Sequence, residues 1–297
     1  MSRWAGLARQ PDTMTDQDAA LSFDPLRPRL IRVAYRMLGS VADAEDAVQE
    51  AFIRWLATDR TTVQEPEAFL RRVVTRICLD VLKSAHKRRT TYPGPWLPDP
   101  IVEREDEVDD VTLPLMLALE RLSPLERAAF LLHDVFGVDF EEIATTLGRE
   151  QNTVRQLAVR ARENVRAARP RYEVPKQRSM EIANAFFSAS RGGDMQALQT
   201  LLAADVIVHA DGGGKRSAAL EPIAGIAAVM QLHAGLAKMF AAHASQLIQF
   251  GFINGLAGFV TLEGDGELQT TAFEIADDKI KAVYIVRNPE KLRHLEA

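Results

Sequence analysis

Cysteine is almost absent from this chain of 297 residues, in which Cys78 is the one thiol. A single cysteine excludes an internal disulfide framework and any zinc finger built on cysteine ligands. No apolar run approaches the roughly 18 residues that a membrane-spanning helix needs. The N-terminal residues 1–20 lack the apolar core of a secretory signal peptide. We therefore expect a protein of the reducing cytosol that has no membrane segment.

Glycine and proline are also scarce, with 17 and 14 residues, which excludes a low-complexity or collagen-like chain. The content of 47% hydrophobic and 26% charged residues is typical of globular proteins. The length predicts roughly two or three domains. The net charge of −5 excludes a uniformly polybasic chain that binds nucleic acid without selectivity.

The charges are strongly segregated along the chain. Residues 71–89 carry seven basic side chains and one acid, and residues 149–178 carry nine basic side chains and three acids. Between them, residues 99–110 carry seven acids and one arginine, and residues 179–297 have a net charge of −4. Because basic clusters attract phosphate groups and acidic segments repel them, two segments of this chain are candidates for nucleic-acid contact.

Hydrophobic periodicity predicts a multidomain fold with two all-α modules followed by an α+β domain. Helical spacing begins at Leu26, and the capping box at Ser123 and the stop at Gly148 mark helix ends in the second module. Strand-like alternation predicts strands at 205–210, 246–252, 255–262, 269–275 and 281–286, with a helix over 222–240. The expected parts are a disordered leader (1–25, with Met14 as a possible natural start), a helical domain (26–90), an acidic, proline-containing linker (91–112), a second helical domain (113–172) and the α+β domain (179–297).

Residues 139–166 have the pattern of a helix-turn-helix, with a short helix, a turn at Gly148 and a longer second helix. Arginine, asparagine and glutamine form paired hydrogen bonds with base edges in the major groove. The second helix carries such side chains on its polar face: Gln151, Asn152, Arg155, Gln156 and Arg160. The pattern favours DNA binding, and the alternative is a solvated, arginine-rich helix in an ordinary bundle.

Two other predicted helices each have a strongly charged face. The helix from Pro66 carries a basic row that fits nucleic acid, an acidic protein or plain solvent: Arg72, Arg76, Lys83, Lys87 and Arg88. The helix before it presents Asp43, Asp46, Gln49 and Glu50 opposite an apolar stripe. A carboxylate row at helical spacing without histidine is more typical of a surface or a protein interface than of a metal site.

Other titratable residues give no specific signal for catalysis. Cys78 and His133 lie within apolar helical patterns, so we expect an inert buried thiol and a core or capping histidine. In the last domain, His209, Asp211 and His233 could line a pocket and exchange protons with a substrate. Residues this isolated in the sequence specify no reaction.

Three segments in order carry a resemblance to a known family: AYRMLGSVADAEDAVQEAFIRW, EAFLRRVVTRICLDVLKSA and LSPLERAAFLLHDVFGVDFEEIATTLGREQNTVRQLAVRAREN. They strongly resemble the extracytoplasmic-function sigma factors of bacterial RNA polymerase. GPWLPDP, DGGGK (Asp211–Lys215) and NPEKL (Asn288–Leu292) are similar to the SigJ-like subgroup, in which a SnoaL-like, NTF2-like cone domain follows the sigma domains. The resemblance covers essentially residues 26–297. It implies a promoter-specific transcription initiation factor, not an enzyme, with no cofactor or metal.

The resemblance implies a partner for each charged helix. The acidic row at Asp43–Glu50 matches the segment that grips the clamp helices of the largest subunit of core polymerase. The basic helix from Phe69 to Lys87 matches the part that melts and holds the −10 promoter strand, and residues 151–166 match the −35 reader. Glu150 stands where the family often has a serine N-cap. An acid suits the helix dipole there, but it leaves the family's usual phosphate contact in doubt.

The resemblance also implies that the C-terminal domain regulates the sigma domains in cis, through Asp211, Lys215, Asn288 and Lys291. Trp96 in the linker offers a large apolar anchor for such docking. One alternative is an active SnoaL-type isomerase or hydrolase attached to a DNA-binding region, which would need an acidic base inside a cavity. A stand-alone repressor is a third interpretation, and it would leave the acidic helix row without a role. The direction in which Asp211 points, into the cavity or toward the sigma modules, separates the first two.

Overall fold

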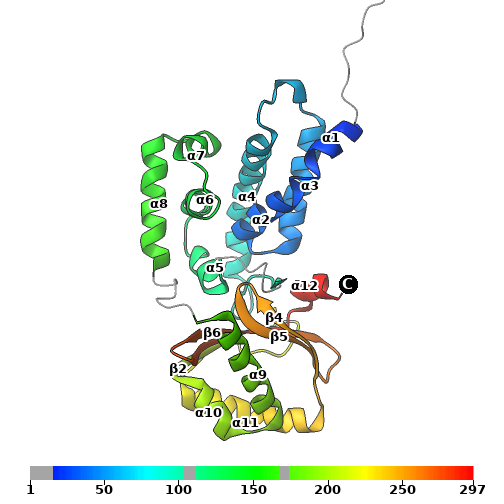
Figure 1. Cartoon of the computed structure of the whole chain (residues 1–297), viewed down its shortest axis with the longest axis vertical. Helices are drawn as coiled ribbons and strands as arrows, with labels where there is room; N and C mark the ends of the chain where they lie inside the picture. Colours follow the sequence, from blue (N-terminus) through cyan, green and yellow to red (C-terminus); the bar gives the residue numbers. More distant parts are fainter. Residues whose placement is uncertain (1–15, 104–110, 167–173, 297) are drawn as a thin grey trace, which may run out of the picture.

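The computed structural model describes residues 16–103, 111–166 and 174–296. Figure 1 shows a helical part at the top of the view and a sheet with helices packed on it below. The order of parts along the chain confirms the predicted fold class, two helical modules followed by a mixed α+β domain.

The first helical part starts before the predicted boundary. Its elements are α1 (Asp16–Phe23), α2 (Arg27–Leu38), α3 (Val41–Leu56), the short 3-10 helix η1 (Arg60–Thr62) and α4 (Pro66–Thr90). The prediction of a disordered leader over residues 1–25 is therefore wrong for α1, and residues 1–15 lie outside the described residues. Phe23 is fully buried, with its ring centroid 4.9 Å from that of Phe52, and this contact anchors α1.

Local capping chemistry sets the ends of the helices in the second helical part. The elements are α5 (Leu113–Leu119), α6 (Pro124–Phe130), its π-helical continuation η2 (Leu131–Val135), α7 (Phe140–Leu147) and α8 (Gln151–Val165). Ser123 and Glu126 form the predicted capping box at the start of α6. Gly148 ends α7 at φ 62°, a left-handed conformation that glycine adopts without strain.

The two helical parts share one hydrophobic core. Trp55 of α3 and Phe130 of α6 are both fully buried in it. Arg127 of α6 donates a hydrogen bond of 2.8 Å to the carbonyl oxygen of Met37 near the end of α2. Burial of apolar side chains against each other stabilises the folded state at roughly 25 cal/mol per Å², so this shared core holds the two helical parts together.

The C-terminal part is a seven-stranded sheet with helices against it, and it includes a strand from the predicted linker. Along the sheet the strand order is β1-β4-β5-β6-β7-β2-β3, with β2 and β7 parallel and the other neighbours antiparallel. The strands are β1 (Val102–Glu103), β2 (Leu202–Asp211), β3 (Ile223–Ala224), β4 (Gln246–Ile253), β5 (Leu256–Leu262), β6 (Leu268–Ala276) and β7 (Lys279–Val286). The helices are α9 (Lys176–Gly192), α10 (Met195–Leu201), α11 (Ile226–Ala242), α12 (Pro289–Leu292) and the short η4 (Arg293–Leu295).

The two faces of this sheet pack against different parts of the chain. One face forms a core with α9 and α11, in which Phe186, Val229 and Phe273 are buried. The other face contributes Ala272, Tyr284 and Val286 to a second core. That second core also contains Leu97 and Leu113, from beyond the sheet domain, and Leu292 of α12. Residues between the two helical parts therefore cover a face of the C-terminal sheet.

Most predicted strands are confirmed, with shifts at their ends. The four predicted strands between 246 and 286 correspond to β4–β7. Strand β2 begins at Leu202, three residues earlier than predicted, directly after α10 ends. The predicted linker over 91–112 contributes β1, in which Val102 pairs with Ile253, and the sequence pattern did not predict this strand. The predicted helix over 222–240 starts at Ile226, after Gly225 at φ 88°.

Candidate nucleic-acid and interdomain interfaces

The predicted −35 reader, α8, turns its polar side chains to solvent. Val154, Ala158, Ala161 and Val165 are buried against the second helical part. On the opposite side, the side chains of Asn152, Arg155, Gln156 and Arg160 are exposed and Gln151 is half-buried. Arg155 lies with its guanidinium 5.6 Å from the Phe140 ring centroid and donates to Asn152. The arrangement presents hydrogen-bonding side chains over the first half of the helix.

Glu150 is the N-cap of α8, in an extended conformation, and its side chain makes no capping hydrogen bond. The first backbone N–H groups of a helix have no partner within the helix, and the helix dipole attracts negative charge to this end. The Glu150 carboxylate supplies that charge without bonding to the N–H groups, whereas a serine N-cap would occupy one of them.

The predicted polymerase-binding residues lie on α3, on the side opposite its buried stripe. Asp46 and Gln49 are exposed, and Asp43 and Glu50 are half-buried. Glu50 forms an ion pair of 2.9 Å with Arg54, one turn further along the helix. The buried residues of α3 include Ala47, Val48 and Ala51, so the acidic row contributes little to the core.

The basic row of α4 meets the helix-turn-helix instead of lying wholly open to solvent. Arg76 donates hydrogen bonds of 3.0 Å and 3.2 Å to the carbonyl oxygens of Thr146 and Thr145, in α7. Arg71 forms an ion pair of 2.6 Å with Glu142 of the same helix. Arg72 is half-buried, Lys83 is exposed and pairs with Asp80, and the side chains of Lys87 and Arg88 lie outside the described residues. In this arrangement α7 occupies part of the predicted −10 surface.

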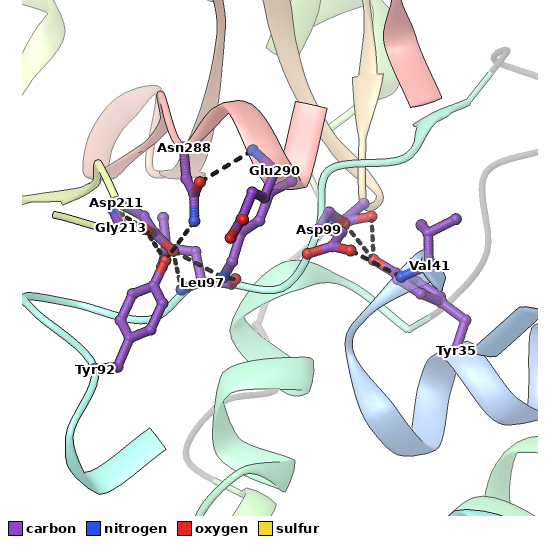
Figure 2. Close-up of polar contacts among 11 residues, drawn as sticks. Tyr35, Val41, Tyr92, Leu97, Asp99, Asp211, Gly213, Asn288 and Glu290 are labelled. Carbon is purple, nitrogen blue, oxygen red and sulfur yellow. Dashed lines mark hydrogen bonds and ion pairs between the residues drawn. The ribbon is translucent and has the colours of Figure 1, made fainter. Parts of the chain in front are cut away.

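Residues 91–101, which we call the strap, run from the end of α4 across the second face of the sheet. Asp211, at the end of β2, has no exposed surface and faces this strap. Its carboxylate accepts hydrogen bonds from the Tyr92 hydroxyl (2.6 Å) and the Leu97 N–H (2.9 Å), which Figure 2 shows. Burial, and then the hydrogen bond to Asp211, raise the pKa of Tyr92 above its usual value. Asp211 therefore binds the strap.

Lys291 of α12 adds a cation to the same place. Its ammonium lies 2.9 Å from the Asp211 carboxylate, donates to the Leu97 carbonyl oxygen and stands 4.2 Å from the centroid of the Trp96 ring. On its other side, Trp96 approaches Gly39: a Cβ on Gly39 would stand 2.7 Å from an atom of the indole ring. Trp96 thus lies between the end of α2 and the C-terminal domain.

The glycines of DGGGK allow close packing against the strap. A Cβ on Gly213 would stand 2.3 Å from the Asn288 side chain, and one on Gly214 would stand 2.8 Å from Pro93. Asn288 donates a hydrogen bond of 2.8 Å to the Tyr92 hydroxyl, and Lys215 forms an ion pair with Glu290. The motifs DGGGK and NPEKL therefore meet at one place, although they are far apart in the sequence.

The other end of the strap binds the first helical part. The Asp99 carboxylate accepts a hydrogen bond of 2.8 Å from the Val41 N–H, and the Asp99 N–H donates to the Gly39 carbonyl oxygen at 2.9 Å. The Tyr35 hydroxyl lies 2.6 Å from the Asp99 carbonyl oxygen. Figure 2 shows the contacts of Asp99 with Val41 and Tyr35 on the right, separate from the Asp211 contacts on the left. Burial is the main cause that raises the pKa of Asp99.

Asn254 joins three parts of the chain, and the sequence analysis missed it. It lies in the turn between β4 and β5, at φ 47°. Its side-chain oxygen is 3.0 Å from the Tyr35 hydroxyl and accepts from the Ile101 N–H at 3.1 Å. Its carbonyl oxygen accepts from the Leu113 N–H at 2.9 Å. The sequence signal was an Asn-Gly turn, which predicts a hairpin and says nothing about its partners.

The candidate catalytic residues of the last domain do not converge. His209 stacks on Tyr284, on the sheet face that the strap covers. His233 belongs to α11 and lies against Phe186, in the core on the other face. Burial lowers the pKa of His209, and it lowers that of His233 to about 4. Since Asp211 binds the strap, these three residues form no acid–base set.

Comparisons with known proteins agree with this architecture. Two families match, Sigma-70 region 2 over residues 23–89 and Sigma-70 region 4 over residues 112–165. The ECF RNA polymerase sigma factor SigJ of Mycobacterium tuberculosis is 37% identical over 286 residues, which cover 91% of each chain. The crystal structure of M. tuberculosis SigJ has a TM-score of 0.75 and 34% identity, covering 92% of this chain and 98% of that chain.

Solved structures of SnoaL-like and NTF2-like proteins also match part of the chain. A SnoaL-like protein of Burkholderia thailandensis matches 38% of this chain and 97% of that chain, with 10% identity and a TM-score of 0.33. No helix among the described residues is long and apolar enough to cross a membrane. The chain carries both sigma regions in order and matches a curated relative over nine-tenths of its length. It belongs to the extracytoplasmic-function sigma factors, non-enzymatic proteins that bind RNA polymerase core and promoter DNA.

Proposed function

We propose that this sigma factor reads the −35 element with the exposed face of α8 and holds the −10 strand with the basic row of α4. The acidic row of α3 binds the clamp helices of core polymerase. The C-terminal domain regulates these activities in cis through the strap. The resemblance in the sequence supports the first three roles, and the exposed side chains of Asp46 and Gln49 on α3 and of Arg155 on α8 are consistent with two of them.

The observation that carries the cis-regulatory proposal is the attachment of the strap at both ends. Asp211 and Lys291 bind its first half, and the first sigma module binds it through Asp99. Groups linked by short segments meet at an effective concentration on the order of mM, so modest contacts are enough to favour the docked state. The C-terminal domain thereby limits how the two sigma modules move relative to each other.

Docking favours a closed arrangement in which part of the −10 surface is covered. The Arg76 guanidinium bonds to α7, and Arg71 pairs with the half-buried Glu142. A promoter strand would need these cations for its phosphates, so DNA and α7 compete for them. Weakening the strap contacts therefore shifts the population toward a form in which α7 releases these cations and promoter DNA binds more readily.

In vitro transcription with core polymerase on genomic promoter DNA tests the proposal. Lys291→Met removes the cation from the strap, and we expect it to raise transcript yield at limiting sigma factor. Lys238→Met, at an exposed position of α11, is the matched control and leaves the yield unchanged. Deletion of residues 179–297 should also change promoter activity markedly. If the Lys291 variant and the deletion both transcribe as the full-length protein does, at matched concentration and salt, cis regulation is wrong.

A further inference from the structure

Val159 is an apolar side chain on the polar face of α8. It is 48% exposed, in the middle of a helix whose core contacts are made by four other residues. Valine is a weaker helix former than alanine or the long polar residues, because its branched side chain loses rotamer freedom in a helix. Neither packing nor helix propensity therefore accounts for a valine at this position.

Its position on the helix places Val159 beside the residues proposed to read bases. It follows Arg155 by four residues and Gln156 by three, so it lies one turn further along the same face. At a rise of 1.5 Å per residue, Val159 is about 12 Å from Gln151 along the helix axis. The major groove is also about 12 Å wide, so side chains from Gln151 to Val159 are within reach of its base edges. Exposed arginines flank this stretch at Arg149 and Arg166, which suits the phosphates on either side.

The major groove offers one apolar feature to such a side chain, the C5-methyl group of thymine. Resting on the proposed function of α8, we propose that Val159 contacts the C5-methyl of a thymine in the −35 element and contributes specificity for that base pair. The methyl groups of valine then bury the thymine methyl. The polar side chains one turn earlier bond the neighbouring base edges.

Replacement of thymine by uracil tests this contact directly, because it removes the methyl group and keeps every hydrogen bond. The probe is a promoter duplex that the wild-type holoenzyme selects from genomic fragments. Each thymine of its −35 element, on either strand, is replaced by uracil one at a time. The dissociation constant is measured for holoenzymes containing the wild-type chain, Val159→Ala, and Ile248→Ala, an exposed apolar control on β4.

One uracil substitution should weaken binding of the wild-type holoenzyme about four-fold, as expected for loss of one buried methyl group. The Val159→Ala holoenzyme should bind the thymine duplex about four-fold more weakly than the wild type does. Uracil at that position should then cause no further loss of affinity. Ile248→Ala should respond as the wild type does. Because Val159 is exposed and alanine favours helices, the variant folds normally.

Three results would overturn the inference. The first is an equal response of wild type and Val159→Ala to uracil at every position. The second is a loss for Val159→Ala that is the same on all duplexes, including one with a scrambled −35 element, since this indicates a contact with polymerase. The third is a selected −35 element made only of G·C pairs. If Gln156→Ala still abolishes −35 protection in a footprint, the proposed role of α8 stands and only the methyl contact fails.

Discussion

The Lys291 ammonium lies 2.9 Å from the Asp211 carboxylate, and the two side chains are 9% and 0% exposed. This ion pair connects the last helix of the chain to the end of β2, and both residues also bind the strap at Leu97. A buried ion pair that also satisfies backbone groups fixes geometry, because either partner alone would be a desolvated charge. The relationship between these two residues therefore determines where the strap lies.

Lys291→Met should destabilise the folded chain by about 3 kcal/mol, since removal of one partner leaves a buried charge uncompensated. Chemical denaturation of the full chain measures this loss. The double variant Lys291→Met with Asp211→Asn should lose less than the sum of the two single variants, because the residues are coupled. Strictly additive losses would mean that the pair does not act as a unit.

Gly39→Ala should displace Trp96 from the end of α2. The backbone at Gly39 is left-handed, at φ 69°, and a Cβ there would collide with the indole ring. Gly137→Ala is a matched control, since Gly137 has φ 67° and no atom within 4 Å of its Cβ position. In both variants the left-handed backbone, once it carries a Cβ, costs roughly 1–2 kcal/mol of stability. We expect a larger loss of thermal stability for Gly39→Ala, and equal losses would argue against the Trp96 contact.

Arg155→Ala and Gln156→Ala should each weaken recognition of the −35 element. A lost paired contact with a base costs about 1–3 kcal/mol of discrimination, which is roughly five- to 150-fold in relative affinity. Footprinting and competition with mutated promoters measure the effect. Asn164→Ala, near the end of α8, serves as the control. Unchanged protection and sequence preference in both variants would exclude α8 as the reader.

Reversal of charge on α3, by Asp46→Lys with Glu50→Lys, should abolish binding to core polymerase while the fold remains intact. Asp46 is exposed and Glu50 is half-buried, so neither supports the hydrophobic core. Glu221→Lys with Glu296→Lys changes the net charge equally at exposed positions of the C-terminal domain. Retention of core polymerase in a pull-down by the α3 variant, at the level of this control, would refute the assignment.

His233 should make stability depend on pH. Burial, and then the nearby Arg191, lower its pKa in the folded chain to about 4, below the usual value of 6.5. Between pH 6.5 and 4 the unfolded chain takes up a proton that the folded chain does not, so stability falls as the pH falls. The slope is about 1.4 kcal/mol per pH unit. Comparison with His233→Leu isolates this contribution, because the variant should lack that slope; identical pH profiles would contradict it.

Local sequence patterns predicted most of the secondary structure. The capping box at Ser123 and the left-handed stop at Gly148 depend on hydrogen bonds and backbone angles within a few residues, so they can be recognised in any sequence. The strands β4–β7 follow from alternation of apolar and polar residues. The motifs DGGGK and NPEKL were recognised from resemblance, but the sequence did not say what each would touch.

Contacts between distant residues were decided only by the tertiary structure. Tyr35 and Asn254 are 219 positions apart, and Arg76 meets Thr146 across 70 positions. Periodicity places a side chain on a face, and it carries no information on which other face will cover it. The sequence by itself determined most of the helices and strands, their charged faces and the family. Burial of both faces of the C-terminal sheet required a cover for the second face, and only packing of the whole chain placed the strap there.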